Sequence, residues 1–360
     1  MNTYNDYSKI EILLKQKRFD QAESIIKNLL AQDFNNTDLL YLLGEIKIRK
    51  DQANEANEIA NRGIGIEPDN SRFYFLKSRV DIIQKNLDTA ESNIQKAIYN
   101  DPDISSYFAL YGQIKMMRKD FEEALRLADE ALELDPEDLD ALNLRSAALI
   151  KLDRKEDSFI TIEGALREDP ENAYTHTNYG WGLLEQGEHK KALEHFKQAL
   201  NSDPNYNFAQ AGLLEAIKAS NPIYRLFLKY AFFMGKLTAQ YQWGVIIGFY
   251  VLFRFLSSLA RNNEGLKPFL MPIVIALAII AFSTWVITPI SNLFLRFNKY
   301  GQLLLSKDEK LSSNFVAFSF LIFLIGIILF ALTQDQKMML VAVFGFTMMV
   351  PLSVIFSVEK

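Results

Sequence analysis

Three histidines are the first candidates for chemistry in this 360-residue chain, because neutral imidazole binds metal ions and transfers protons near pH 7. A helical metal site needs two histidines four residues apart, which places both on one face, together with a carboxylate. His189 and His195 are six residues apart and point in different directions, and His176 falls at an interhelix position of the preceding helix. We therefore interpret all three as packing residues and expect no metal site.

Other catalytic arrangements are also missing from the sequence. The chain has no cysteine, which excludes disulfides, thiolate zinc sites and thiol nucleophiles. The glycine pair in "RGIGIEP", residues 62–68, follows no expected strand and opens no helix, so it is not typical of a phosphate-binding loop. No nucleophile is paired with a base. We expect a protein that is not an enzyme and that uses no cofactor.

The elements that position these residues repeat with a period of 34. Proline keeps this spacing, each time after an acidic residue, and two columns of small residues keep it as well. The columns are Pro68, Pro102, Pro136, Pro170 and Pro204; Ala56, Ala90, Ala124, Ser158 and Ala192; and Gly63, Ala97, Ala131, Ala165 and Ala199. Small residues let two helices approach closely, and the acid–proline pair ends the second helix. The pattern predicts helix–turn–helix units that stack into a solenoid.

This pattern resembles the tetratricopeptide-repeat (TPR) family. Residues 173–206 match it best, with Tyr179, Gly180, Leu183, Gly187, Ala192, Phe196, Ala199 and Pro204 at the family's signature offsets. The resemblance implies an all-α fold: repeats at 3–36, 37–70, 71–104, 105–138, 139–172 and 173–206, and a capping helix at 207–220. The first unit is degenerate. Ile10 stands at the position that Gly180 occupies in the sixth unit, and Phe34 stands where the later units have proline; such departures are typical of a terminal repeat.

In that family the first helix of each repeat lines a concave groove that binds a protein or peptide partner. Carried onto this sequence, the resemblance gives as groove residues Tyr7, Tyr41, Arg72, Phe75, Arg79, Tyr174, Asn178 and Trp181. Tyr, Trp and Arg dominate interface hot spots. Two interpretations of Arg72 and Arg79 stay open: they bind a carboxylate or acidic peptide, or they pair with acids of neighbouring repeats. The family's set of Lys, Asn and Arg for clamping an acidic chaperone tail is not present in any three consecutive repeats.

The chain changes character after residue 220. Residues 1–220 carry 27 Lys/Arg and 39 Asp/Glu, a balance of −12, whereas residues 221–360 carry 12 and 5, a balance of +7. The acidic part argues against nucleic acid as a partner. Four apolar runs follow, at about 243–259, 266–290, 313–333 and 338–358, and each has the ~20 residues that a membrane span needs. The sequence predicts a four-helix transmembrane bundle within residues 241–360; the alternative is a buried soluble core.

Lysines and arginines in short loops orient membrane spans. Eight lie on one expected side, namely Arg225, Lys229, Lys236, Arg296, Lys299, Lys307, Lys310 and Lys360; three lie on the other, namely Arg261, Lys267 and Lys337. We therefore expect a multi-pass membrane protein whose solenoid, 291–312 loop and carboxyl terminus are cytoplasmic. The first residues lack the apolar core of a signal peptide, which agrees.

Two groups of charges lie at the expected membrane. Residues 221–240 include a basic amphipathic helix with Arg225, Lys229 and Lys236 on one side. Such a helix lies in the membrane interface; the alternative is that it packs against the last repeat. Arg254 falls inside the first span, where it either has a functional role or snorkels to the far headgroups.

These observations favour a membrane-anchored scaffold that binds a protein or peptide in a cytoplasmic groove, with the lipid bilayer as its second partner. One version of this hypothesis places it in an envelope or secretion assembly. The alternative is a small membrane transporter or lipid-handling enzyme with the repeats as a regulatory arm. Four spans with almost no charge offer a poor polar pathway for that alternative.

Overall fold

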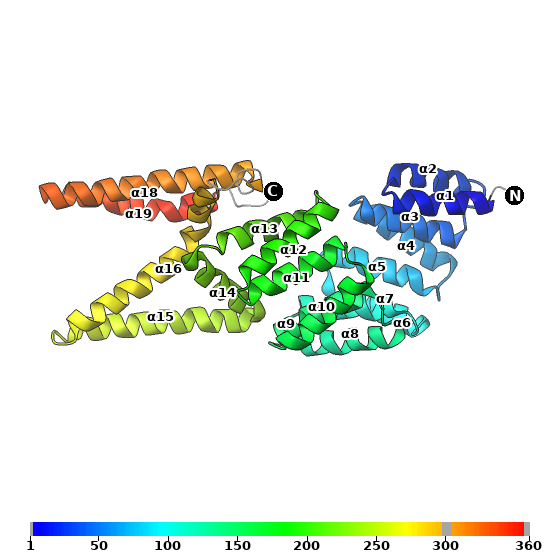
Figure 1. Cartoon of the computed structure of the whole chain (residues 1–360), viewed down its shortest axis with the longest axis horizontal. Helices are drawn as coiled ribbons and strands as arrows, with labels where there is room; N and C mark the ends of the chain where they lie inside the picture. The colour runs from blue at the N-terminus through cyan, green and yellow to red at the C-terminus, as the bar shows by residue number, and fades with distance from the viewer. Residues whose placement is uncertain (1–2, 297–303, 356–360) are drawn as a thin grey trace. The chain divides into compact units, whose positions relative to one another are not determined.

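The computed structural model describes residues 3–296 and 304–355, with side chains from residue 6 onward. Every regular element in these ranges is an α-helix (Figure 1). The chain divides into two compact units, residues 1–170 and 171–360, and each is described by itself. This division by compactness does not test the predicted boundary at residue 220, which follows the repeat pattern.

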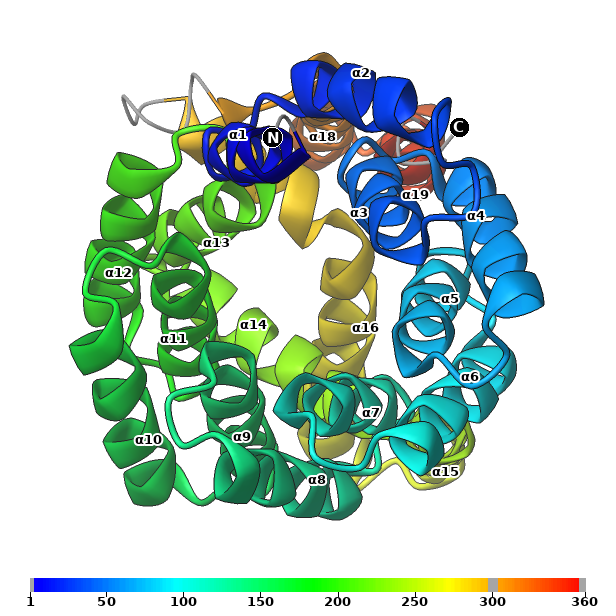
Figure 2. The ribbon, with the colours of Figure 1, turned by 90° about the vertical axis from the view of Figure 1, so that its right-hand side faces the viewer.

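The first unit consists of five helix pairs that correspond to the first five repeats. The helices are α1 (Thr3–Lys15), α2 (Phe19–Leu30), α3 (Thr37–Arg49), α4 (Ala53–Ile66), α5 (Ser71–Ile83), α6 (Leu87–Asn100), α7 (Ser105–Met117), α8 (Phe121–Leu134), α9 (Leu139–Lys151) and α10 (Lys155–Glu168). The odd-numbered helices form an inner layer and the even-numbered helices an outer layer (Figure 2). The expected all-α solenoid is confirmed.

The turn inside each repeat depends on one residue with a positive φ. These residues also keep the period of 34: Lys17, Asp51, Lys85, Lys119, Asp153 and Gly187, with φ from 56° to 86°. A left-handed residue reverses the chain between the two helices, and glycine adopts it with the least strain. Only the sixth repeat has glycine at this position, so only this turn can be predicted from a glycine in the sequence.

The columns of small residues lie where two helices cross. Ala56, Ala90 and Ala124 are fully buried. A Cβ atom added to Gly44 would come within 2.3 Å of Leu76 Cδ2, so no larger residue fits there without movement. Where the same column holds serine, the hydroxyl is used: Ser78 Oγ donates to the carbonyl of Ala90 at 2.8 Å. The predicted close approach of the helices is therefore present.

The second unit contains the sixth repeat, the cap and the apolar helices. Its helices are α11 (Ala173–Glu185), α12 (His189–Ser202), α13 (Asn207–Lys218), α14 (Pro222–Lys236), α15 (Ala239–Asn262), α16 (Lys267–Leu295), α18 (Lys307–Thr333) and α19 (Gln336–Val354). The last four helices are long enough and apolar enough to cross a membrane. The four predicted spans fall on these four helices, except that Leu266 and Ile355 lie just beyond the helix ends. The last residues of the fourth span, 356–358, lie outside the described residues.

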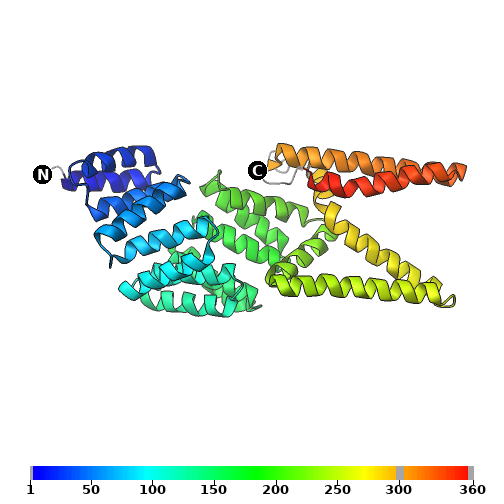
Figure 3. The same ribbon diagram turned by 180° about the vertical axis from the view of Figure 1, so that it is seen from behind.

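The four apolar helices form two hairpins, α15–α16 and α18–α19 (Figures 1 and 3). The second hairpin is tightly packed, since a Cβ on Gly326 would lie 2.5 Å from the backbone nitrogen of Ala342, and a Cβ on Gly345 2.5 Å from that of Phe323. Close contact through small residues is typical of helices in a bilayer. The first hairpin is different: α15 and α16 meet at their connecting turn and diverge toward α14.

Candidate functional site

The inner layer of the first unit carries a row of aromatic side chains on consecutive repeats. Tyr41 of α3 lies edge-on to Phe73, with ring centroids 6.3 Å apart, and Phe75 of α5 packs against Tyr107 of α7 at 5.0 Å. Burial, and then the nearby Glu45 carboxylate, raise the pKa of Tyr41, so its hydroxyl stays protonated. Tyr7 of α1 extends the row, and its hydroxyl donates to Asn36 Oδ1 at 3.4 Å.

Two arginines flank this row, and each forms an ion pair with the preceding repeat. Arg72 Nη2 lies 2.7 Å from Asp38, and Arg79 pairs with Glu45. The Arg72 guanidinium also lies 5.3 Å from the centre of the Tyr41 ring. The ion pairs correspond to the second of the two interpretations left open by the sequence. A binding role for these arginines stays a prediction, but their charge is already balanced.

Asp140 of α9 is the candidate that sequence reasoning missed. It occupies the repeat position that holds Asp38 and Arg72 in the second and third repeats. Desolvation, and then the charge of Asp138, raise the pKa of its carboxyl group, while the charge of Arg79 acts in the opposite direction. The repeat column was the signal that could have identified it. An acidic group on an inner helix favours a cationic ligand.

The predicted groove residues of the sixth repeat lie on α11, in the second unit. Tyr174 is exposed and Asn178 is half-buried. Trp181 is packed into an aromatic cluster: it stacks on Phe208 at 5.3 Å between centroids and meets Phe196 edge-on at 5.7 Å. Trp181 therefore contributes to the packing of the cap, and Tyr174 is the more accessible of the two rings.

The three histidines lie on α11 and α12 of the sixth repeat. No group of three or more His, Asp or Glu side chains in the described residues is arranged to hold a metal ion. Instead, His176 Nδ1 lies 2.9 Å from His195 Nδ1, and the His195 ring lies 4.4 Å from that of Tyr179. Burial, and then the charge of His176, lower the pKa of His195 to about 4. His189 is the first residue of α12.

Family models decide the nature of the repeats. Models of the tetratricopeptide repeat match residues 13–80, 112–173 and 173–206. The solenoid is a tetratricopeptide-repeat domain. None of these models extends beyond residue 206, and no curated protein matches the chain.

Among the solved structures that are similar to this chain, one reaches a TM-score of 0.50. A tetratricopeptide repeat protein from Parabacteroides merdae is similar with a TM-score of 0.50 at 17% identity, over 58% of this chain and 81% of that protein. TTC0263, a thermophilic TPR protein in Thermus thermophilus, has a TM-score of 0.47 at 14% identity, over 50% and 98%. YrrB, a TPR protein with an unusual peptide-binding site, has a TM-score of 0.36 at 15% identity, over 52% and 96%.

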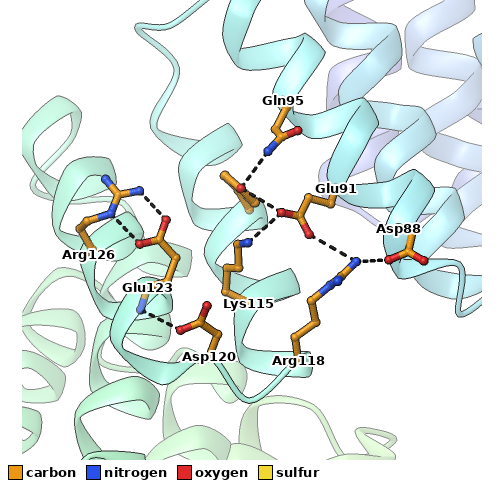
Figure 4. Close-up of polar contacts among 9 residues, drawn as sticks. Asp88, Glu91, Gln95, Lys115, Arg118, Asp120, Glu123 and Arg126 are labelled. Atoms are coloured by element: carbon orange, nitrogen blue, oxygen red, sulfur yellow. Dashed lines mark hydrogen bonds and ion pairs between the residues drawn. The ribbon is translucent and has the colours of Figure 1, made fainter.

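An ionic network joins the third and fourth TPR repeats (Figure 4). Glu91 of α6 accepts hydrogen bonds from Lys115 Nζ at 2.7 Å and from the Tyr111 hydroxyl at 3.0 Å. Arg118 lies 3.3 Å from Glu91 and also pairs with Asp88. Burial works to raise the pKa of Glu91, but the hydrogen bonds from Lys115 and Tyr111 outweigh it and lower the pKa. The network holds two neighbouring repeats in register.

The same network occurs two repeat periods earlier, between the first and second repeats. Glu23, 7% exposed, lies 2.8 Å from both Lys47, which is 4% exposed, and Lys50. Burial works to raise the pKa of Glu23, but contacts with these lysines and Lys27 lower it to about 2. Between the fourth and fifth repeats the corresponding positions hold Leu125 and Leu149, which belong to an apolar cluster.

The cations predicted to contact the membrane face the sixth repeat. Arg225 Nε donates to the carbonyl of Ala219 at 2.9 Å, at the end of α13, and Lys236 lies 3.3 Å from Glu185 of α11. The Lys229 side chain approaches Gly187, which forms the turn of the sixth repeat. The opposite face of α14 exposes large apolar residues at helical spacing: Ile223, Leu226, Tyr230 and Phe233.

Arg254 lies on α15 with its side chain exposed, and it is not among the residues that line the apolar groove between α15 and α16. A charge on the outer face of an apolar helix is the arrangement expected for snorkelling. Arg254 is seven residues before Arg261, or roughly 10 Å along the helix axis. Its functional role stays untested.

Proposed function

We propose that this chain is a membrane-anchored adaptor whose tetratricopeptide repeats hold a protein segment on their inner face. The observation that carries the proposal is the aromatic row of Tyr7, Tyr41 and Phe75, displayed on three successive repeats. Aromatic anchors with flanking arginines account for much of the energy of protein interfaces. Backbone and side-chain contacts along an extended segment follow the same repeat spacing.

The partner segment carries a lysine or arginine next to apolar residues. Arg72 and Arg79 are neutralised by Asp38 and Glu45, so the arginines offer little net attraction for an acidic peptide. Asp140 supplies an acidic group on the inner layer, and the fourth and fifth repeats, residues 105–172, carry 17 Asp/Glu against 9 Lys/Arg. Charge complementarity speeds association and selects among partners.

The four apolar helices tie the repeats to the bilayer, with the TPR domain on the cytoplasmic side. The attachment is supported by contacts within the second unit. Leu214 of the capping helix α13 packs in one cluster with Leu295 of α16 and with Leu305. The Tyr224 hydroxyl of α14 donates to Glu215 of α13 at 2.7 Å. The sixth repeat is thereby fixed to the apolar helices, and the exposed stripe of α14 lies in the cytoplasmic interface.

Photocrosslinking in native membranes tests the adaptor function. A photoreactive amino acid in place of Tyr41 should capture a defined partner, and Asp140→Lys should reduce the captured amount about fivefold or more, because it puts like charges together. Glu133→Lys is the matched control, since this exposed acid lies at the end of the outer helix α8. Equal capture by both lysine variants, or capture of the same partner from Tyr99 on the outer helix α6, would count against the proposal.

A further inference from the structure

The diverging hairpin of the second unit contains an apolar groove. It has a volume of about 490 Å³ and is lined by Tyr230 of α14, by Val245, Ile246 and Phe249 of α15, and by Ile280, Ala281, Thr284 and Trp285 of α16. Figures 1 and 3 show α15 and α16 separating with distance from their connecting turn. The cause lies in the side chains: Ser257 and Ala260 are buried near the turn, where the helices touch, whereas large residues line the diverging part.

The lining of the groove offers few polar groups that could hold water. Thr284 Oγ1 donates to the carbonyl of Ala281 at 2.7 Å, so it needs no water. Only Tyr230 and Trp285 bring other polar side-chain atoms to the lining. A buried water needs two to four polar partners, which this surface does not supply. A space left empty would lose the dispersion contacts of its lining.

We infer that the groove holds one acyl chain of a phospholipid from the cytoplasmic leaflet. The inference rests on the proposed membrane embedding of α15 and α16. Val245 to Phe249 are six to ten residues after the start of α15 at Ala239, which is roughly 9–15 Å along the helix. That depth lies within the ~30 Å hydrocarbon core and not among the headgroups.

The size of the groove selects an acyl chain over a partner helix. The lining extends over only Val245 to Phe249 of α15 and Ile280 to Trp285 of α16, which is less than two turns of each helix and too short to seat a partner helix along its length. A hydrocarbon chain is thinner and can follow the groove along its length. Ile246, Ile280 and Trp285 are exposed along the groove, so a chain can enter sideways from the bilayer. The exposed apolar stripe of α14 reaches the groove through Tyr230.

Retained lipid provides the test. The full chain is purified in mild detergent, and its bound phospholipid is counted by native mass spectrometry. Wild type should retain about one phospholipid per chain more than Ala281→Phe, which fills the groove. Ala276→Phe is the matched control, because Ala276 is an exposed alanine on the same helix outside the groove, and it should behave as wild type.

A second measurement uses Trp285 as a reporter in a Trp181→Phe/Trp243→Phe background. Brominated phosphatidylcholine, added at one to two molecules per chain in excess detergent, should quench Trp285 fluorescence, and Ala281→Phe should remove most of this quenching. Equal lipid counts in the two phenylalanine variants, unchanged quenching, or a dimer that carries no lipid would overturn the inference. Release of the protein from membranes by alkaline carbonate would instead contradict the membrane embedding itself.

Discussion

The Nδ1 atoms of His176 and His195 lie 2.9 Å apart in the sixth repeat, so protonation of both rings would place two like charges in contact. The contact needs one protonated and one bare Nδ1, which two neutral rings in different tautomers provide. The sequence placed His176 correctly at an interhelix position. It could not give the partner, because the pairing depends on how α11 crosses α12.

At the scale of single residues, we predict that the free energy of unfolding of the sixth repeat falls at mildly acidic pH. The folded state lowers the pKa of His195 from 6.5 to about 4, so the unfolded state binds more protons between these values. The contribution of His195 to the free energy of unfolding is therefore complete above pH 6.5 and is lost as the pH falls toward 4. Between pH 7 and pH 5 the loss should reach at most about 2 kcal/mol.

Hydrogen exchange of the α11 and α12 backbone measures this effect. The protection factors of these amides, which are corrected for the intrinsic chemical rate, should fall between pH 7 and pH 5, and His195→Gln should flatten the profile. His189→Gln is the control, since His189 lies outside the pair. A pH profile that is the same in wild type and His195→Gln would show that the pair has no role.

At the scale of the helices, the period of 34 predicted the repeats and the crossings of their helices. It predicted less about what joins one repeat to the next. The two ionic networks occupy the same repeat positions, two periods apart. The first consists of Asp20, Glu23, Lys47 and Lys50, and the second of Asp88, Glu91, Lys115 and Arg118. A search for single-period columns misses this, because the interface in between has no acid–lysine pair at these positions. There, Asp81 replaces the lysine, and Gln84 donates to Asn54 at 3.2 Å.

We predict that the network sets register more than it adds stability. Glu91→Gln should cost about 3 kcal/mol, because it leaves the Lys115 charge largely buried without its counter-ion. The double variant Glu91→Leu/Lys115→Leu copies Leu125 and Leu149 of the apolar interface, and it should restore stability to within about 1 kcal/mol of wild type or above it. Thermal denaturation of residues 1–360 in detergent, followed on the helices by circular dichroism, gives the comparison. A double variant less stable than Glu91→Gln would contradict this view.

The sequence assigned Tyr7, Tyr41 and Phe75 to one row from repeat position alone, and their role in binding stays a prediction. The sequence did not give the partners of the charged residues or of Trp181. Whether Arg72 finds Asp38 or a ligand depends on side-chain reach across two repeats. Whether Trp181 faces a ligand depends on Phe208 of the cap, which lies outside the repeat pattern.

At the scale of the whole molecule, the change in composition after residue 220 correctly anticipated four long apolar helices. It did not anticipate that Arg225 and Lys236 of α14 would face the sixth repeat and leave an apolar stripe exposed. A hydrophobic pattern gives the two faces of a helix, but not which face the rest of the chain will cover. The stripe and the groove at Tyr230 are the surfaces that we propose contact lipid.

The central claim, that a cytoplasmic TPR domain is held on the membrane by four spans, can be tested directly because the chain has no cysteine. Single cysteines at Tyr99 in the repeats, Asn263 in the α15–α16 turn and Gln334 in the α18–α19 turn are exposed to a membrane-impermeant maleimide. The account predicts that the cysteines at 263 and 334 are labelled in intact cells, whereas the one at 99 is labelled only after permeabilisation. Labelling at 99 in intact cells, or protection of both turns, would contradict it.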